Sequence, residues 1–154
     1  FGCGAHGDVI RFLTDAHGLP FIEAVKQLAA EAGLDMPAPS REARARAEEQ
    51  DSLADLAERA ATWFTAQLAG QAGAAARAYL ARRGVSADLA RRFGLGLAPD
   101  ARNALRGHMN DVAAERLAAA GLVGIGDDGH AFDRFRGRLM FPIRSARGRV
   151  VGFG

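Results

Sequence analysis

The sequence has almost no cysteine and no long hydrophobic run. Cys3 is the single cysteine among 154 residues, which excludes an internal disulfide framework and fits a reducing cytoplasm. No apolar stretch approaches the ~20 residues that a membrane-spanning helix needs, so we expect no membrane partner. With 49% hydrophobic and 25% charged residues, the composition is that of a globular protein.

Signatures of an active site are also lacking. No two carboxylates have the spacing that general acid–base or two-metal chemistry needs, and Asp127 and Asp128 belong to a turn sequence. There is no Walker-type loop, no Gly-x-Ser-x-Gly motif and no dinucleotide fingerprint. On its residues alone, we interpret the chain as a binding surface that carries no catalytic centre of its own.

Lysine is scarce as well, because Lys26 is the only one and arginine carries nearly all the positive charge. The net charge of +2 is unevenly spread. Residues 1–76 hold six basic and eleven acidic side chains, a balance of −5, whereas residues 77–154 hold fourteen arginines and seven acids, a balance of +7. This asymmetry suggests that the C-terminal half meets a polyanion.

The one cysteine stands among glycines at the very start, in Phe1–Gly7. A structural zinc ion takes four ligands, which one thiolate cannot supply. Cys3 is therefore either a thiol without a role or the last ligand of a zinc site whose other ligands lie upstream. The chain lacks an initiator Met and stops inside an expected strand, so we interpret it as an internal piece of a longer protein.

Hydrophobic periodicity and end signals predict a mostly helical N-terminal two-thirds. Three helices are expected at about 8–17, 20–32 and 41–69. A fourth ends within 79–84, a fifth spans 87–93, and a sixth runs from Asn110 or Asp111 to Gly121. The Pro-rich segment 36–40 is expected to be a linker, and 95–98 a short strand.

The last third predicts a small, mainly antiparallel sheet, which makes the fold class α+β. Turn sequences occur at 126–129 and 145–149. The run 132–143 alternates with period two and is expected to be one strand, in which Pro142 marks an edge or the strand end. One face would carry Phe135, Leu139, Phe141 and Ile143, and the other Arg134, Arg136, Arg138 and Arg144.

Such a row of arginines is suited to binding the phosphates of a nucleic acid. Alternate residues on a strand stand ~7 Å apart, from a rise of ~3.3 Å per residue, close to the distance between successive phosphates on an extended nucleic-acid strand. The forked guanidinium group binds phosphate at two points, so the row would follow a backbone without reading bases. The alternative is an ordinary solvated face of a sheet.

Several strings together resemble the bacterial DNA primase of the DnaG type. Residues 1–13 are similar to the end of its zinc-binding domain. Residues 79–84, 92–99, 133–144 and 148–154 are similar to the start of its RNA polymerase domain. The resemblance covers the whole chain in family order. It implies three parts: 1–35 as the end of a truncated zinc ribbon with a helical hairpin, 36–50 as a linker, and 51–154 as the N-terminal subdomain of the catalytic core.

Carried over residue by residue, the resemblance makes Cys3 the fourth zinc ligand, with its Cys partner one residue before Phe1 and the remaining Cys and His further upstream. His6 would not be a ligand. Arg83 matches an arginine that lines the family's template groove, and Arg134 and Arg136 fall in the basic string beside it. The acids that bind Mg or Mn in the Toprim part would lie beyond Gly154.

The resemblance further implies short RNA primers made on single-stranded DNA during replication, from ribonucleoside triphosphates, within a primosome. This chain would bind the template and be inactive by itself, and it would not hold zinc tightly. A replicative helicase would be contacted through a further C-terminal region, and we expect a monomer. Three alternatives stay open: a non-enzymatic single-strand-binding module, a fragment of a phage-type helicase–primase, and a pseudogene or assembly fragment.

Overall fold

The computed structural model describes residues 7–34, 38 and 40–154 and divides into two compact units, Phe1–Arg44 and Ala45–Gly154. Cys3, His6 and positions 36, 37 and 39 of the expected linker lie outside the described residues. No helix in the described part of the chain is long and apolar enough to cross a membrane.

The first unit contains a hairpin of two helices, α1 (Val9–His17) and α2 (Phe21–Glu31). The Asp8 carboxylate accepts a hydrogen bond of 2.8 Å from the backbone N–H of Arg11 and so caps α1. Gly18 ends this helix with φ of 65°, a conformation that glycine adopts without strain. Both expected helices are confirmed because their end signals are local.

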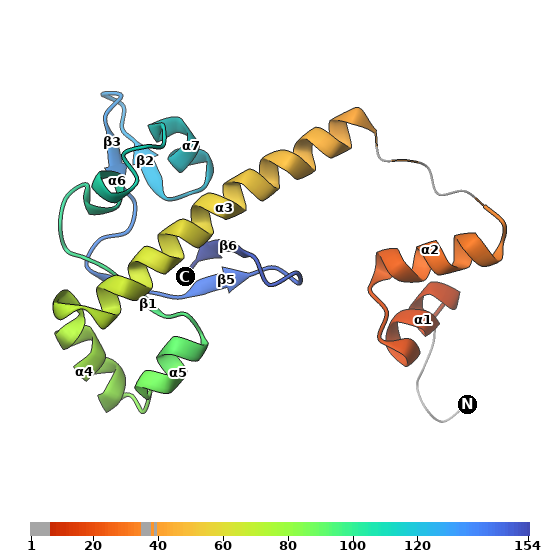
Figure 1. Ribbon diagram of the computed structural model, residues 1–154, viewed down its shortest axis with the longest axis horizontal. Coiled ribbons are helices and arrows are strands. Elements are labelled where there is room, and N and C mark those ends of the chain that lie inside the picture. The colour runs from red at the N-terminus through yellow and green to blue at the C-terminus, as the bar shows by residue number, and fades with distance from the viewer. Residues whose placement is uncertain (1–6, 35–37, 39) are drawn as a thin grey trace. The chain divides into compact units, whose positions relative to one another are not determined.

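The second unit is organised around α3 (Arg41–Ala69), whose first four residues belong to the first unit. A 3₁₀ turn, η1 (Gln71–Gly73), leads into α4 (Ala74–Arg82) and α5 (Ala87–Arg92) near the C-terminal end of α3 (Figure 1). The remaining elements are β1 (Gly96–Ala98), α6 (Ala104–His108), α7 (Ala114–Ala119), β2 (Val123–Ile125), β3 (Ala131–Asp133), β4 (Arg138–Met140), β5 (Pro142–Arg144) and β6 (Val150–Phe153).

The strands of the second unit form three two-stranded antiparallel pairs. Strand β1 pairs with β4, β2 with β3, and β5 with β6. Both expected turns join paired strands: 126–129 between β2 and β3, and 145–149 between β5 and β6. The α+β class with small antiparallel sheets is confirmed.

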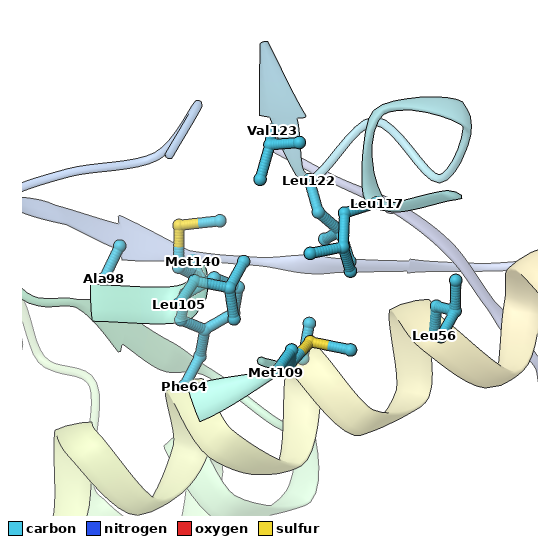
Figure 2. Close-up of a cluster of buried hydrophobic side chains, with 10 residues drawn as sticks. Leu56, Phe64, Ala98, Leu105, Met109, Leu117, Leu122, Val123 and Met140 are labelled. Atoms are coloured by element: carbon cyan, nitrogen blue, oxygen red, sulfur yellow. The ribbon is translucent and has the colours of Figure 1, made fainter. Parts of the chain in front are cut away.

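The core lies between α3 and the shorter elements (Figure 2). From α3 come Leu56, Ala60 and Phe64, and from the elements that follow come Ala98, Leu105, Met109, Leu117, Leu122, Val123 and Met140. Strand β1 approaches α3 closely at Gly96, where an added Cβ would stand 2.8 Å from the carbonyl carbon of Phe64. Glycine is therefore required at this crossing, because an added Cβ would also stand 2.5 Å from the Cβ of Phe64, and neither atom can move aside without moving α3.

The expectation of one strand over 132–143 is wrong. Strand β3 ends at Asp133, and Gly137 turns the chain with φ of 60° before β4 begins. Phe135 faces inward as expected, with its ring centroid 5.9 Å from that of Phe153. Beyond the turn the alternation changes phase, so Met140 is buried while Phe141 is 47% exposed and Ile143 52% exposed.

The expected helix from Asn110 or Asp111 is also placed wrongly. Helix α7 begins at Ala114, and the carboxylate of Asp111 instead receives two hydrogen bonds of 2.9 Å from the guanidinium of Arg59 on α3. Helix α6 was not expected from the sequence. Its five residues are too few for a periodic signal.

Candidate nucleic-acid interface

A hollow of about 590 Å³ lies beside β3 and carries a concentration of positive charge. It is lined by Arg102, Asn103, Ala131, Phe132, Asp133, Arg134, Arg136 and Arg138, and we call it the basic pocket. Three of its four arginines are predicted site residues. They gather although the segment that carries them is not a continuous strand.

Backbone hydrogen bonds at both ends of residues 134–137 explain why these arginines lie close together. The N–H of Arg134 donates to the carbonyl of Leu122 at 3.1 Å, and the N–H of Gly137 donates to the carbonyl of Pro99 at 3.2 Å. Between these two anchors the ring of Phe135 packs into the core, edge-on to Phe64 with centroids 6.5 Å apart. Its neighbours Arg134 and Arg136 are left exposed.

Most of this charge is not neutralised within the described residues. Arg136 Nε lies 2.9 Å from Asp100 Oδ1, whereas no described carboxylate comes within 4 Å of Arg102, Arg134 or Arg138. Unpaired guanidinium groups around one hollow make a local positive potential that attracts an anion with several oxygens.

Asp133 is the one acid in the lining of the basic pocket, and its role is structural. Its carboxylate accepts hydrogen bonds from the backbone N–H of Leu105 at 2.8 Å and of Arg106 at 3.1 Å. These are orphan donors at the start of α6, so Asp133 caps this helix from another element. The negative charge of the Asp133 carboxylate also interacts favourably with the positive N-terminal end of the helix dipole.

The other two predicted arginines lie elsewhere. Arg83, at the C-terminal end of α4, bonds through Nε to the Tyr79 hydroxyl at 3.1 Å and lies over that ring. Arg144 on β5 bonds through Nη1 to Glu58 at 3.2 Å and to the Gly148 carbonyl at 2.8 Å. Arg144 therefore does not continue the row of Arg134, Arg136 and Arg138 that the period-two pattern predicted. Arg83, which only the resemblance assigned, also lies outside the basic pocket lining.

Two members of the basic pocket, Arg102 and Asn103, were missed by sequence reasoning. They precede α6 and lie some thirty residues before the arginine string. No motif or spacing in the sequence connects the two segments. Long-range contacts bring them together: Asp133 caps α6, Arg106 donates to the carbonyl of Ala131 at 2.7 Å, and Gly137 donates to the carbonyl of Pro99.

Acids of α3 neutralise some of the arginines in the C-terminal half of the chain. Glu49 pairs with Arg116 at 2.8 Å, Asp55 with Arg149 at 2.6 Å, and Glu58 with Arg144. Because these acids lie before residue 77 and their partners after it, the +7 balance overstates the charge open to a polyanion. Among the arginines left without an acidic partner in the described residues, Arg102, Arg134 and Arg138 lie together around the basic pocket.

A second hollow, of about 520 Å³, lies between the C-terminal part of α3 and helices α4 and α5. Its wall is mainly apolar, with Leu68, Leu80 and Leu95 among the lining residues. Arg77 is in this wall but donates to the carbonyls of Leu68, Ala69 and Gly70 at 2.6–3.0 Å, which caps the end of α3. This hollow does not suit phosphate.

The metal chemistry expected from the sequence is not complete in this chain. Cys3, the predicted zinc ligand, lies outside the described residues and is the only cysteine. Within the described residues no three His, Cys, Asp or Glu side chains form a group that could hold a metal ion. The described residues by themselves therefore form neither a four-ligand zinc site nor a divalent catalytic centre.

Two family models match the chain. The CHC2 zinc finger matches residues 1–44, and the DNA primase catalytic core, N-terminal domain, matches residues 63–154. The second match alone spans more than half of the sequence.

Curated relatives and a solved structure agree with these matches. DNA primases from Haemophilus influenzae and Escherichia coli K12 are 38% and 40% identical, over 100% of this chain and 27% of each relative. The chain thus spans about a quarter of the length of the curated relatives it matches. A solved DnaG primase catalytic domain bound to ssDNA is similar with a TM-score of 0.66 and 35% identity, over 70% of this chain and 36% of that one.

Proposed function

The chain belongs to the family of DnaG-type bacterial DNA primases, and we propose that it provides template-strand binding to an enzyme that makes short RNA primers. In this proposal residues 1–35 end a zinc ribbon, 36–50 are a linker, and 51–154 form the N-terminal subdomain of the catalytic core. The template is single-stranded DNA.

The basic pocket is the observation that carries the proposal. Four arginines line one hollow, and only Arg136 has an acidic partner among the described residues. Guanidinium groups pair with phosphate oxygens in a forked geometry, so the pocket favours a phosphodiester backbone over a neutral ligand. The similar solved domain that is bound to ssDNA supports the same partner.

Within this proposal, the DNA strand is bound by four arginines, which are Arg102, Arg134, Arg136 and Arg138. Arg83 and Arg144 lie outside the basic pocket, so they would contact the strand beyond it. Arg144 would first have to leave Glu58 and the Gly148 carbonyl, so we expect it to contribute less than Arg134 and Arg138, which have no acidic partner among the described residues.

The rest of the enzyme would lie outside this sequence. Cys3 would be the fourth ligand of a zinc ion whose other ligands precede it. Mg or Mn ions held by Toprim acids would stabilise the charge that develops as ribonucleoside triphosphates are joined. A replicative helicase would bind a further C-terminal region of a monomeric, cytoplasmic primase.

Fluorescence anisotropy of a labelled single-stranded DNA, titrated with this chain at several salt concentrations, tests the proposal. The test variant changes Arg102, Arg134 and Arg138 to Gln. The matched control changes Arg41, Arg44 and Arg46 to Gln, which removes the same charge from exposed positions at the start of α3. Circular dichroism verifies that both variants are folded.

We expect the pocket variant to lower the affinity and to flatten the slope of log K against log salt. The slope should change by about 0.7 for each phosphate that the protein no longer neutralises, or about 2 for three phosphates. The control variant should keep a slope close to that of the unchanged chain. Equal effects of the two variants would show that only net charge matters and would reject the basic pocket as the template site.

A further inference from the structure

Phe132 is an unexpected side chain for a site that binds only phosphate. It lines the basic pocket among the arginines and is 52% exposed. Single exposed apolar residues are common on protein surfaces, but this one is among the residues that line a charged hollow. Sites for single-stranded nucleic acid combine a basic groove with aromatic rings on which bases stack.

The ring of Phe132 is held in place before any ligand arrives. Phe132 on β3 is the cross-strand partner of Gly124 on β2. A Cβ added at Gly124 would stand 2.4–3.0 Å from three ring atoms, so part of the ring lies directly on the glycine backbone. The remainder of the side chain stays open. A ring positioned in advance loses less entropy when a base stacks on it.

Asn103 adds a polar group to the same hollow. It occupies the N-cap position of α6 with φ of 55°, yet its side chain makes no capping hydrogen bond. Asp133 caps the helix instead. Within the described residues the amide of Asn103 therefore remains available, and an amide carries both donors and an acceptor that suit the edge of a base.

We propose that the basic pocket holds one nucleotide of the single-stranded template, with its base stacked on Phe132 and its edge at the amide of Asn103. The arginines bind the phosphates on either side. The volume of about 590 Å³ lies in the range typical of pockets that enclose a small ligand. This inference rests on the proposed function, because it assigns a base contact to the same strand.

The first experiment uses the unchanged chain and two labelled oligonucleotides of equal length. One has ordinary thymidines, and in the other abasic residues replace the central ones. Because both carry the same phosphates, we expect the abasic strand to bind at least about fivefold more weakly, since stacking of one base contributes ~1–3 kcal/mol. The salt slopes should be equal.

The second experiment changes the ring. Phe132→Leu keeps an apolar side chain and removes the aromatic face, so the affinity for the thymidine strand should fall to that for the abasic strand. Phe132→Tyr should restore it. The matched control is Phe93→Leu, at a phenylalanine that is 59% exposed and outside the pocket lining; it should bind like the unchanged chain.

Gly124→Ala and Asn103→Ala complete the set. The added methyl group displaces the ring without removing it, so Gly124→Ala should also weaken binding to the thymidine strand. Asn103→Ala should reduce the differences in affinity between homopolymeric strands of different bases.

Equal binding of the thymidine and abasic strands, with no effect of Phe132→Leu, would overturn the base contact. If the arginine variant still lost salt-sensitive binding, the proposed template function would stand. Loss of the difference between the arginine variant and its control would instead reject the proposed function, so the two failures are distinguishable.

Discussion

The two units of the molecule differ in where their apolar side chains lie. The second unit has eighteen buried hydrophobic residues, ten of which form one cluster against α3. Among the described residues of the first unit, only Leu13 and Ala24 are buried, while Val9, Phe12, Phe21, Ile22 and Leu34 are 54–68% exposed. Both units nevertheless contain well-capped helices. Local signals thus define helices in either unit, but only the second adds long-range burial, from which most helical stability in proteins comes.

The sharpest way to test this difference is to remove one buried side chain from each unit. Phe64→Ala leaves a cavity at the centre of the core, where Phe64 is 1% exposed, and should lower the free energy of unfolding by about 3–5 kcal/mol. Leu13→Ala should have a smaller effect. Urea unfolding can be followed by the fluorescence of Trp63, which is the only tryptophan and reports on the second unit.

We expect Phe64→Ala to shift the Trp63 transition strongly and Leu13→Ala to leave it unchanged. A shift of the same transition by Leu13→Ala would mean that the first unit contributes to the stability of the second. The two units would then not unfold independently.

A smaller effect is expected where a long-range contact completes a helix of the second unit. Asp133→Ala leaves the N–H groups of Leu105 and Arg106 without their acceptor and should destabilise the second unit by about 1–3 kcal/mol. Asp127→Ala, in the exposed turn between β2 and β3, is the matched control and should change little. Thermal unfolding measures both, and equal melting temperatures would contradict the capping role.

Helix capping within each unit should have a still smaller effect. Asp8 caps α1 and Ser86 caps α5, each by accepting a hydrogen bond from the N–H three residues on. Replacing either by Ala should cost about 1 kcal/mol locally. Ser86→Ala should move the Trp63 transition, whereas Asp8→Ala should only increase amide hydrogen exchange in α1. The reverse pattern would contradict the division into two units.

The smallest expected effect is a pH dependence confined to the second unit. The hydrogen bonds from Arg59 hold the pKa of Asp111 below its ordinary value of 3.8. A lowered folded-state pKa stabilises the protein above the unfolded-state value, and this contribution is lost as the pH falls through the folded-state value. The chain should therefore unfold at higher urea than Asp111→Asn at pH 7, with a difference that begins to shrink near pH 4 and disappears only below the lowered folded-state pKa. A difference that persists there would contradict the ion pair.

Sequence reasoning succeeded where a structural feature depends on neighbouring residues. Helix α3 occupies the expected span 41–69, and the cap at Ser86 and the stop at Gly94, with φ of 66°, are local. It failed at Phe132–Ile143, where a turn at Gly137 interrupts an alternating pattern. The period-two pattern of the sequence continues through this turn, although the strand is interrupted there.

The candidate site divides in the same way. The string Arg134–Arg138 was visible as a concentration of arginine, but its partners Arg102 and Asn103 had no local signal. Arg144 belonged to the same pattern and proved to be bonded to Glu58, 86 residues away in the sequence. Charge patterning identifies which residues are basic and leaves open which of them remain unpaired.

By itself, the sequence determined the family, the principal helices, the two turns and the uneven distribution of charge, because these depend on residue identity and on contacts between near neighbours. Only the tertiary structure decided that acids of α3 neutralise Arg116, Arg144 and Arg149. It also decided that Arg102, Asn103 and Phe132 join three other arginines around one hollow. The physical reason is that each of these outcomes depends on contacts between residues about 30 to 95 positions apart, which packing of the core on α3 brings together.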